Sequence, residues 1–86
     1  MFTAFRKSVG GRSHNRYFHD WDNAKAAMEK DIKDMVGAKL AIVTKRYDHF
    51  NHAKGFYVYE ANGLSHKGEA ISWALIDSYF EDETGD

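Results

Sequence analysis

Residues 20–37 read DWDNAKAAMEKDIKDMVG, and this stretch decides the fold. Its apolar residues recur at steps of three, four or one, which places them along one stripe of a helix. Asp20 is expected to cap the first turn, because a carboxylate there can accept hydrogen bonds from free backbone N–H groups. Gly37 is expected to end the helix, and Glu29 and Lys33 are expected to pair on its exposed side. The predicted helix runs from Trp21 to Val36, with an apolar stripe of Trp21, Ala24, Met28, Ile32, Met35 and Val36.

After the helix, the period of the apolar residues changes to two, which is typical of β-strands. Strands are predicted over residues 40–47, 56–61 and 70–80. The polar segment 48–55 and the turn signal at residues 62–63, Asn-Gly, make the connections short. We therefore expect these strands to pair antiparallel as a meander.

The segment before the helix leaves two topologies open. Residues 2–9 alternate well enough for a strand, and the glycines at 10–11 can close a hairpin onto residues 12–18. If residues 12–18 form a strand, the order is β-β-α-β-β-β; if they form a loop, it is β-α-β-β-β. Either way, the chain is predicted to be one α+β domain over residues 1–86, with one amphipathic helix on a four- or five-stranded, mostly antiparallel sheet.

Both faces of the predicted strands carry apolar or aromatic residues, whereas a sheet with one wet face should alternate cleanly. A single helix covers only one face. We therefore expect the other face to be covered by a second copy or another protein, or else by the N-terminal segment of the same chain. Tyrosine and tryptophan are enriched in protein interfaces, so the predicted partner-binding residues are Tyr47, Tyr57, Tyr59, Trp73 and Tyr79.

The charge is balanced in sum and uneven along the chain. The net charge is −1, so the whole molecule has no strong field for nucleic acid or membrane. Residues 6–16, however, hold four basic residues and no acid, and residues 81–86 hold four acids and no base. The first segment can face an anion, and the second can contact a basic partner.

The residue types that are missing exclude several classes of site. Without cysteine there is no disulfide framework, no thiolate zinc site and no cysteine nucleophile. The first residues lack the apolar core of a secretory signal, and no apolar run is long enough to span a bilayer. We expect a cytoplasmic protein.

A glycine-rich stretch supplies the candidate anion site. Gly10 and Gly11 are followed by Arg12 and Arg16, so backbone N–H groups and guanidinium groups can surround a phosphate. The stretch matches neither a Walker motif nor a dinucleotide fingerprint. Aromatic residues are interleaved with these bases, which is a pattern of nucleic-acid binding. The sequence thus leaves open a small-anion or nucleotide binder and an RNA-binding module.

The histidines and acids give little support for catalysis. Asp48, His49 and His52 contain metal-ligating groups, but a spacing of three suits a helix better than an extended turn. His14, His19 and His66 can in principle act as acid and base in RNA cleavage, yet nothing in the sequence places them together. We expect no metal, no cofactor and no enzymatic activity.

One acid stands inside an otherwise apolar strand. Asp77 breaks the alternation of that strand, so we expect it either to lie beyond the edge of the core or to meet a cation such as Arg6 or Lys45.

Two segments, WDNAKAAMEK at 21–30 and ISWALIDSYFE at 71–81, carry a resemblance to the small accessory proteins of bacterial phages and prophages. The resemblance implies a protein that binds and blocks a host factor, as anti-CRISPR and other anti-defence inhibitors do; some such proteins instead sequester a nucleotide signal. It assigns no site residues. Together with the surface argument, it predicts a non-enzymatic binding protein, expected to be a homodimer, that occupies a surface of a partner macromolecule.

Overall fold

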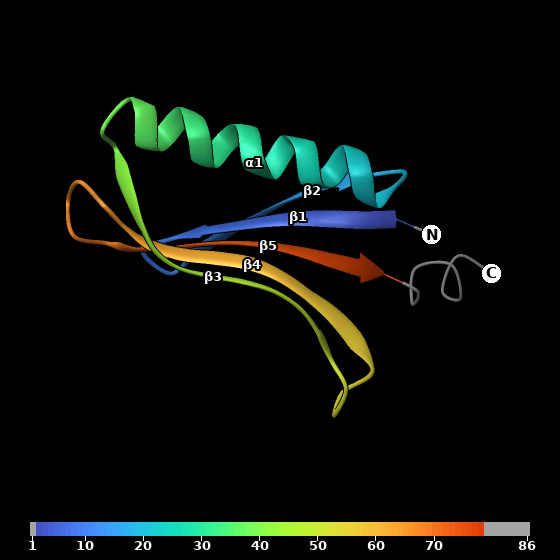
Figure 1. Cartoon of the computed structure of the whole chain (residues 1–86). Helices are drawn as coiled ribbons and strands as arrows, with labels where there is room; N and C mark the ends of the chain where they lie inside the picture. Colours follow the sequence, from blue (N-terminus) through green and yellow to red (C-terminus); the bar gives the residue numbers. More distant parts are fainter. Residues whose placement is uncertain (1, 79–86) are drawn as a thin grey trace.

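The chain forms one helix and five strands in the computed structural model, which describes residues 2–78 (Figure 1). The α+β class is confirmed, and the order β-β-α-β-β-β shows that residues 12–18 are a strand. The elements are β1 (Phe2–Val9), β2 (Arg12–Phe18), α1 (Trp21–Gly37), β3 (Ala41–Asn51), β4 (Phe56–Ser65) and β5 (Ala70–Ser78).

All neighbouring strands of the sheet run antiparallel, in the order β2-β1-β5-β4-β3. The predicted meander of β3, β4 and β5 is confirmed. The N-terminal hairpin joins the sheet beside β5, with Phe5 opposite Leu75, and so it extends the sheet instead of folding across it. Among the described residues, α1 covers one face and no segment covers the other (Figure 1).

The helix begins as predicted. The side chain of Asp20 accepts a hydrogen bond from the backbone N–H of Asn23 at 2.8 Å. This bond satisfies one of the donors that the first turn of any helix leaves free.

The end of the helix differs from the prediction. Gly37 is still helical, and the residue with left-handed backbone is Lys39, at φ 60°. The N–H of Lys39 bonds to the carbonyl of Val36, and the N–H of Leu40 bonds to that of Met35. This pair of bonds is a Schellman motif, in which a lysine occupies the position that usually holds glycine.

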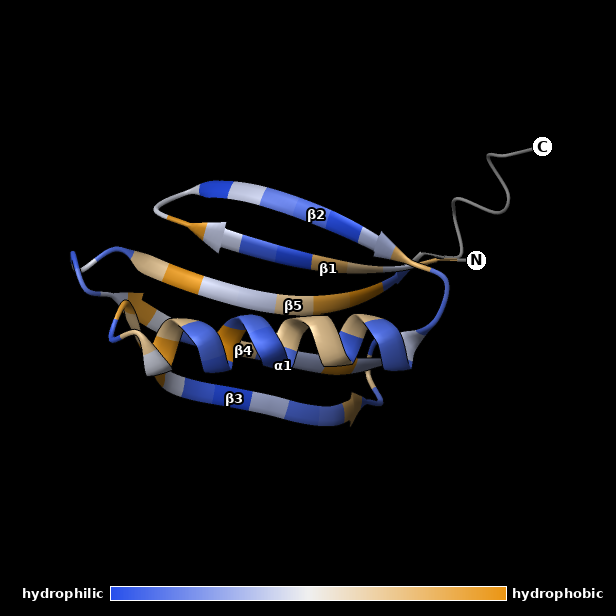
Figure 2. Cartoon of the chain, turned by 90° about the horizontal axis from the view of Figure 1, so that it is seen from above, coloured by the Kyte–Doolittle hydropathy of each residue, from blue (hydrophilic) through white to orange (hydrophobic). Residues whose placement is uncertain are grey.

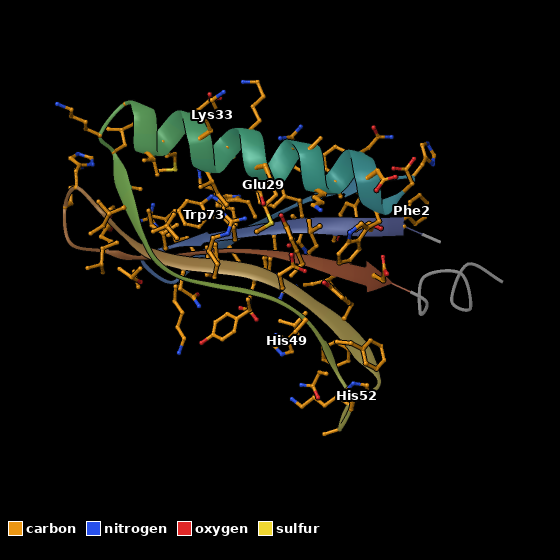
Figure 3. All side chains as sticks on the ribbon, viewed as in Figure 1. Phe2, Glu29, Lys33, His49, His52 and Trp73 are labelled. Carbon is orange, nitrogen blue, oxygen red and sulfur yellow. The ribbon has the colours of Figure 1, made fainter. Side chains whose placement is uncertain are left out.

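The predicted pairing of Glu29 with Lys33 is wrong. Glu29 is directed toward the sheet, where Arg46 reaches it, and Lys33 points away from the sheet (Figure 3). The ion pair on the exposed side of the helix instead joins Lys30 to Asp34 at 2.7 Å. An ion pair between this carboxylate and the guanidinium on β3 stabilises the fold more than a pair with a freely rotating lysine in water would.

The core lies between α1 and the middle of the sheet. Its largest fully buried side chains are Trp73, Met28 and Ile71. The indole N–H of Trp73 donates to Asp31 at 2.8 Å, and Lys7 forms an ion pair with the same carboxylate. Burial of Trp73 therefore leaves no unpaired donor beneath the helix.

The Asn-Gly signal at residues 62–63 does not mark a turn. β4 continues through it, and the register with β3 shifts between Val43 and Lys45. Gly63 permits this irregularity, because a Cβ at that position would lie 2.0 Å from the carbonyl oxygen of Ile42. The glycine is thus required by a close approach of two strands. The turn comes later, at residues 66–69, with Gly68 at φ 81°.

Candidate functional site

The predicted partner-binding residues do not share one face. Trp73 and Tyr59 are buried beneath the helix, Tyr57 lies on the helix side, and Tyr47 is half-buried on the opposite face. Tyr79 lies outside the described residues. The prediction of an aromatic platform on the face opposite the helix is therefore wrong.

The reason lies in the size of the alternating residues of β5. The face of β5 opposite the helix carries Ser72 and Ala74, with Ser8 of β1 and Asn62 and Glu60 of β4 beside them in register. Small and polar side chains tolerate water, so this face needs no cover at its centre.

An aromatic surface does exist, at the N-terminal end of α1. The ring of Trp21 meets the ring of Tyr57 edge-on, with centroids 6.0 Å apart, and Phe50 is the register partner of Tyr57 on β3. Phe50 is 45% exposed and Tyr57 is 44% exposed. These three residues, Trp21, Phe50 and Tyr57, are called the aromatic cluster below.

The shape of the sheet leaves the aromatic cluster open. The hairpin of β3 and β4 runs beyond β5 and bends away from α1 toward its tip (Figure 1). Side chains near the tip therefore have no helix above them. Sequence reasoning missed Phe50, because β3 was expected to end at residue 47. Residues 46–50 mix polar and aromatic residues on both faces, so no alternation in the sequence extends the strand.

Hydrogen bonds fix the side chains around the aromatic cluster. Tyr59 and Arg46 both donate to the carboxylate of Glu29, and the phenol of Tyr57 donates to Asp48. The ammonium of Lys25 lies 5.1 Å from the centroid of the Tyr59 ring, a cation–π contact. Two cations thus stand among two carboxylates, so the surroundings of the cluster are close to neutral.

Both phenols remain protonated at neutral pH. Burial and the hydrogen bond to Glu29 raise the pKa of Tyr59 to about 12. The hydrogen bond to Asp48, followed by partial burial, raises the pKa of Tyr57 above its ordinary value. Each phenol therefore keeps its donor role, which holds the two rings in place.

A second apolar surface lies where α1 ends and β3 begins. Four large aliphatic side chains there are between 41% and 60% exposed. A hollow of about 340 Å³ runs along this surface, with Lys39 and His66 among its lining residues. The four residues, called the aliphatic patch below, are Val36, Leu40, Ile42 and Leu64.

The glycine loop is not a phosphate cradle. Gly10 and Gly11 have φ values of 57° and 86°, as the two-residue turn of a β-hairpin requires. The N–H of Gly10 donates to the carbonyl of Ala70. The carboxylate of Glu69 lies so close that a Cβ at Gly10 would meet its oxygen at 2.8 Å. The N–H of Gly10 is already bonded, and the negative charge of Glu69 repels an anion, so both oppose phosphate binding here.

Of the two arginines of the predicted anion site, Arg12 adjoins the loop as the first residue of β2, whereas Arg16 lies four residues further along the strand. Arg12 and Arg16 are on β2, in register with Val9 and Phe5 of β1. The guanidinium of Arg16 lies 5.2 Å from the centroid of the Phe18 ring. They form a basic edge of the sheet and do not converge on one point.

The histidine candidates do not converge either. Asp48 and His49 are consecutive residues of β3, so their side chains point to opposite faces. His52 lies in the turn beyond, next to Phe50 (Figure 3). In the part of the chain that the structure describes, no group of three or more histidine and carboxylate side chains is placed to hold a metal ion.

Asp77 lies beyond the edge of the core, as the first of its two predicted placements states. It lies near the end of β5 and is exposed. The hydroxyl of the buried Thr3 donates to its carboxylate at 2.8 Å. Arg6 is on the opposite face of the sheet and does not reach it.

The fold and these surfaces define an α+β protein with one helix on a five-stranded antiparallel sheet. Exposed apolar side chains lie at both ends of the helix: the aromatic cluster at its N-terminal end and the aliphatic patch at its C-terminal end. A scan against protein-family models found no matching family, and searches among curated proteins and solved structures found no match. The described helix, α1, is too short and too polar to cross a membrane.

Proposed function

We propose that this chain is a binding protein that docks on another protein through the aromatic cluster. The observation that carries the proposal is the joint exposure of Phe50 and Tyr57 beside Trp21, with the ring of Tyr57 held by edge-on packing against Trp21 and by a hydrogen bond to Asp48. Rigid aromatic side chains give large contact area at a low cost in conformational entropy. Tryptophan, tyrosine and arginine are also the residue types that dominate binding energy in protein interfaces.

Charge favours a protein partner over a nucleic acid at this surface. Glu29 and Asp48 lie beside the aromatic cluster. Because Lys25 and Arg46 balance these two carboxylates, the surroundings of the cluster are close to neutral and offer no net attraction to a phosphate backbone. The complementary partner surface has uncharged apolar groups at its centre and polar groups at its rim.

The proposed role needs no chemical step. A protein that covers a partner's surface blocks whatever else would bind there, and this agrees with the resemblance to phage accessory proteins that block host factors. The absence of cysteine suits a reducing cytosol, where we propose that the protein acts.

A random-peptide library displayed on phage, selected against the full chain, tests the proposal. The affinity of each enriched peptide is then measured by calorimetry for the parent protein, for Phe50→Ser combined with Tyr57→Ser, and for Tyr17→Ser. Tyr17 is the matched control, because it is an exposed tyrosine on the opposite face of the sheet. Tyr57→Phe keeps the ring and removes only the hydroxyl.

We expect the double variant to lose about 100-fold in affinity, as for the removal of a hot spot. Tyr17→Ser is expected to stay within about threefold of the parent, and Tyr57→Phe is expected to lose much less affinity than the double variant, because it keeps the ring and loses only the hydrogen bond to Asp48. Circular dichroism of each variant verifies its fold. Enriched peptides that bind the folded double variant as tightly as the parent would show that the aromatic cluster is not the docking surface.

A further inference from the structure

The N-terminal hairpin carries an acid-free polar surface on the side of the sheet opposite the helix. Between Phe2 and Phe18 the sequence has no aspartate or glutamate. Register and alternation place five side chains together on this side of β1 and β2, and Figure 2 shows that β2 is hydrophilic along most of its length. They are called the hairpin face below: Arg6, Ser8, Ser13, Asn15 and Tyr17.

Hydrogen bonds orient the cation of the hairpin face. The Nε–H of Arg6 donates to the amide oxygen of Asn15 at 3.0 Å, and the amide nitrogen of Asn15 donates to the hydroxyl of Tyr17 at 3.3 Å. Because Arg6 is held through Nε, its two terminal nitrogens remain as a fork that matches two oxygens of one phosphate. Ser8 and Ser13 add a pair of hydroxyls 2.7 Å apart.

An open aromatic ring lies beside this fork. Tyr17 is 56% exposed, and its register partner on β1 is Ala4. A base can stack on such a ring whatever its identity, because every base has a π-face.

The arginines of the hairpin are not neutralised within the described part of the chain. Lys7 forms an ion pair with Asp31, but Arg6, Arg12 and Arg16 have no carboxylate within ion-pair distance. Arg12 and Arg16 lie on the helix side of β2, so positive charge surrounds this edge of the sheet.

We propose that the hairpin face binds single-stranded nucleic acid, with Arg6 on a backbone phosphate and Tyr17 under the neighbouring base. An acidic protein segment would use the arginine and the polar donors but not the exposed ring. A duplex keeps its bases stacked inside, so it cannot offer one to Tyr17. This site lies on the other side of the sheet from the aromatic cluster, and it goes beyond the docking function proposed above.

Fluorescence anisotropy with labelled 12-nucleotide oligo-U and oligo-dT tests the proposal on the full chain. The variants are Arg6→Ala, Asn15→Ala, Tyr17→Ala and Tyr17→Phe. Lys33→Ala is the matched control, since it removes one exposed cation from the outer side of α1 (Figure 3).

We expect Tyr17→Ala and Arg6→Ala to weaken binding about tenfold each, and Asn15→Ala to weaken it less, because Asn15 only positions Arg6. Tyr17→Phe and Lys33→Ala should stay within about twofold. One phosphate contact, through Arg6, predicts a slope of about −0.7 for the logarithm of the binding constant against the logarithm of salt concentration, and this slope should approach zero in Arg6→Ala.

Four results would overturn the proposal: no binding at millimolar protein, a duplex bound as tightly as the single strand, competition by a polyglutamate peptide as strong as that by unlabelled oligo-U, or an equal loss in Lys33→Ala. Melting curves verify that each variant is folded. None of these results affects the peptide-binding test of the aromatic cluster, so the two proposals fail separately.

Discussion

The phenol of Tyr59 donates a hydrogen bond to the carboxylate of Glu29, and this bond joins β4 to α1 directly beneath the aromatic cluster. The ring of Trp21 packs against the same tyrosine, with centroids 6.1 Å apart. Because Arg46 donates to the same carboxylate, three elements meet at one acid. This contact fixes the angle between the helix and the hairpin, and hence the shape of the proposed docking surface.

Removal of the Tyr59 hydroxyl should destabilise the protein. We expect Tyr59→Phe to lower the free energy of unfolding by about 1 to 2 kcal/mol, because Glu29 loses one of its two donors. Urea denaturation measures the change. Tyr17→Phe removes an exposed hydroxyl and should change stability by less than about 0.5 kcal/mol. Equal stability of Tyr59→Phe and the parent would show that the bond contributes nothing.

The same tyrosine predicts a loss of stability at high pH. The pKa of Tyr59 is raised from 10.0 to about 12 in the folded protein. A raised pKa stabilises the fold fully below the unfolded value near 10, and this stabilisation is lost as the pH rises through about 12. Urea denaturation at pH 8, 10 and 11 should therefore show a decline that is shallower in Tyr59→Phe. Parallel declines in the two proteins would contradict the assigned pKa.

The helix terminus offers a stabilising substitution. Lys39 has a left-handed backbone, which costs a residue with a Cβ about 1 kcal/mol relative to glycine. Lys39→Gly should raise the free energy of unfolding by about that amount, whereas Lys39→Ala should not. Thermal denaturation compares the two. Destabilisation by Lys39→Gly would mean that the lysine side chain matters more than the backbone conformation.

The close approach at Gly63 predicts a severe defect. A Cβ there would lie 2.0 Å from the carbonyl oxygen of Ile42, so Gly63→Ala must push β3 away from β4. We expect a loss of more than about 2 kcal/mol. Gly37→Ala is the control, since a Cβ there meets nothing within 4 Å. Similar urea midpoints for the two variants would contradict the close approach.

The homodimer expected from the sequence stays a prediction, and the structure offers one surface where a second copy can sit. The aliphatic patch borders β3, an edge strand with unpaired backbone groups. Sedimentation velocity should therefore give twice the mass of one chain at high concentration, and Ile42→Lys should give a single chain. Phe56→Lys, an exposed apolar position at the other end of the hairpin, should still dimerise. A parent protein that stays monomeric would remove this prediction.

Most of the fold could be predicted from residues whose roles are local. The stripe from Trp21 to Met35, the cap at Asp20 and the glycine turn after Val9 depend on neighbours in sequence, whereas Val36, predicted as part of the stripe, is exposed. The turn signal at residues 62–63 failed because Gly63 is required by the close approach of β3, more than 15 residues away in the chain, and not by a turn. A long-range contact of this kind leaves no periodic signal.

The candidate site was harder to predict, because the choice of face depends on packing. Alternation shows that Trp73 and Ala74 point opposite ways, but it does not say which way the helix lies. The helix packs on the face that carries Trp73, and it therefore buries two of the predicted interface residues, Trp73 and Tyr59. The exposure of Phe50 and Tyr57 depends on the bend of the hairpin, which is a property of the whole sheet.

The two indole N–H signals in a ¹⁵N–¹H correlation spectrum test the docking surface most directly. Trp21 belongs to the aromatic cluster, whereas Trp73 is buried and bonded to Asp31. Trp21→Phe assigns the two signals by removing one. On titration with a peptide enriched from the displayed library, the account predicts that the Trp21 signal shifts and the Trp73 signal does not. Saturable binding that leaves the Trp21 signal in place would contradict it.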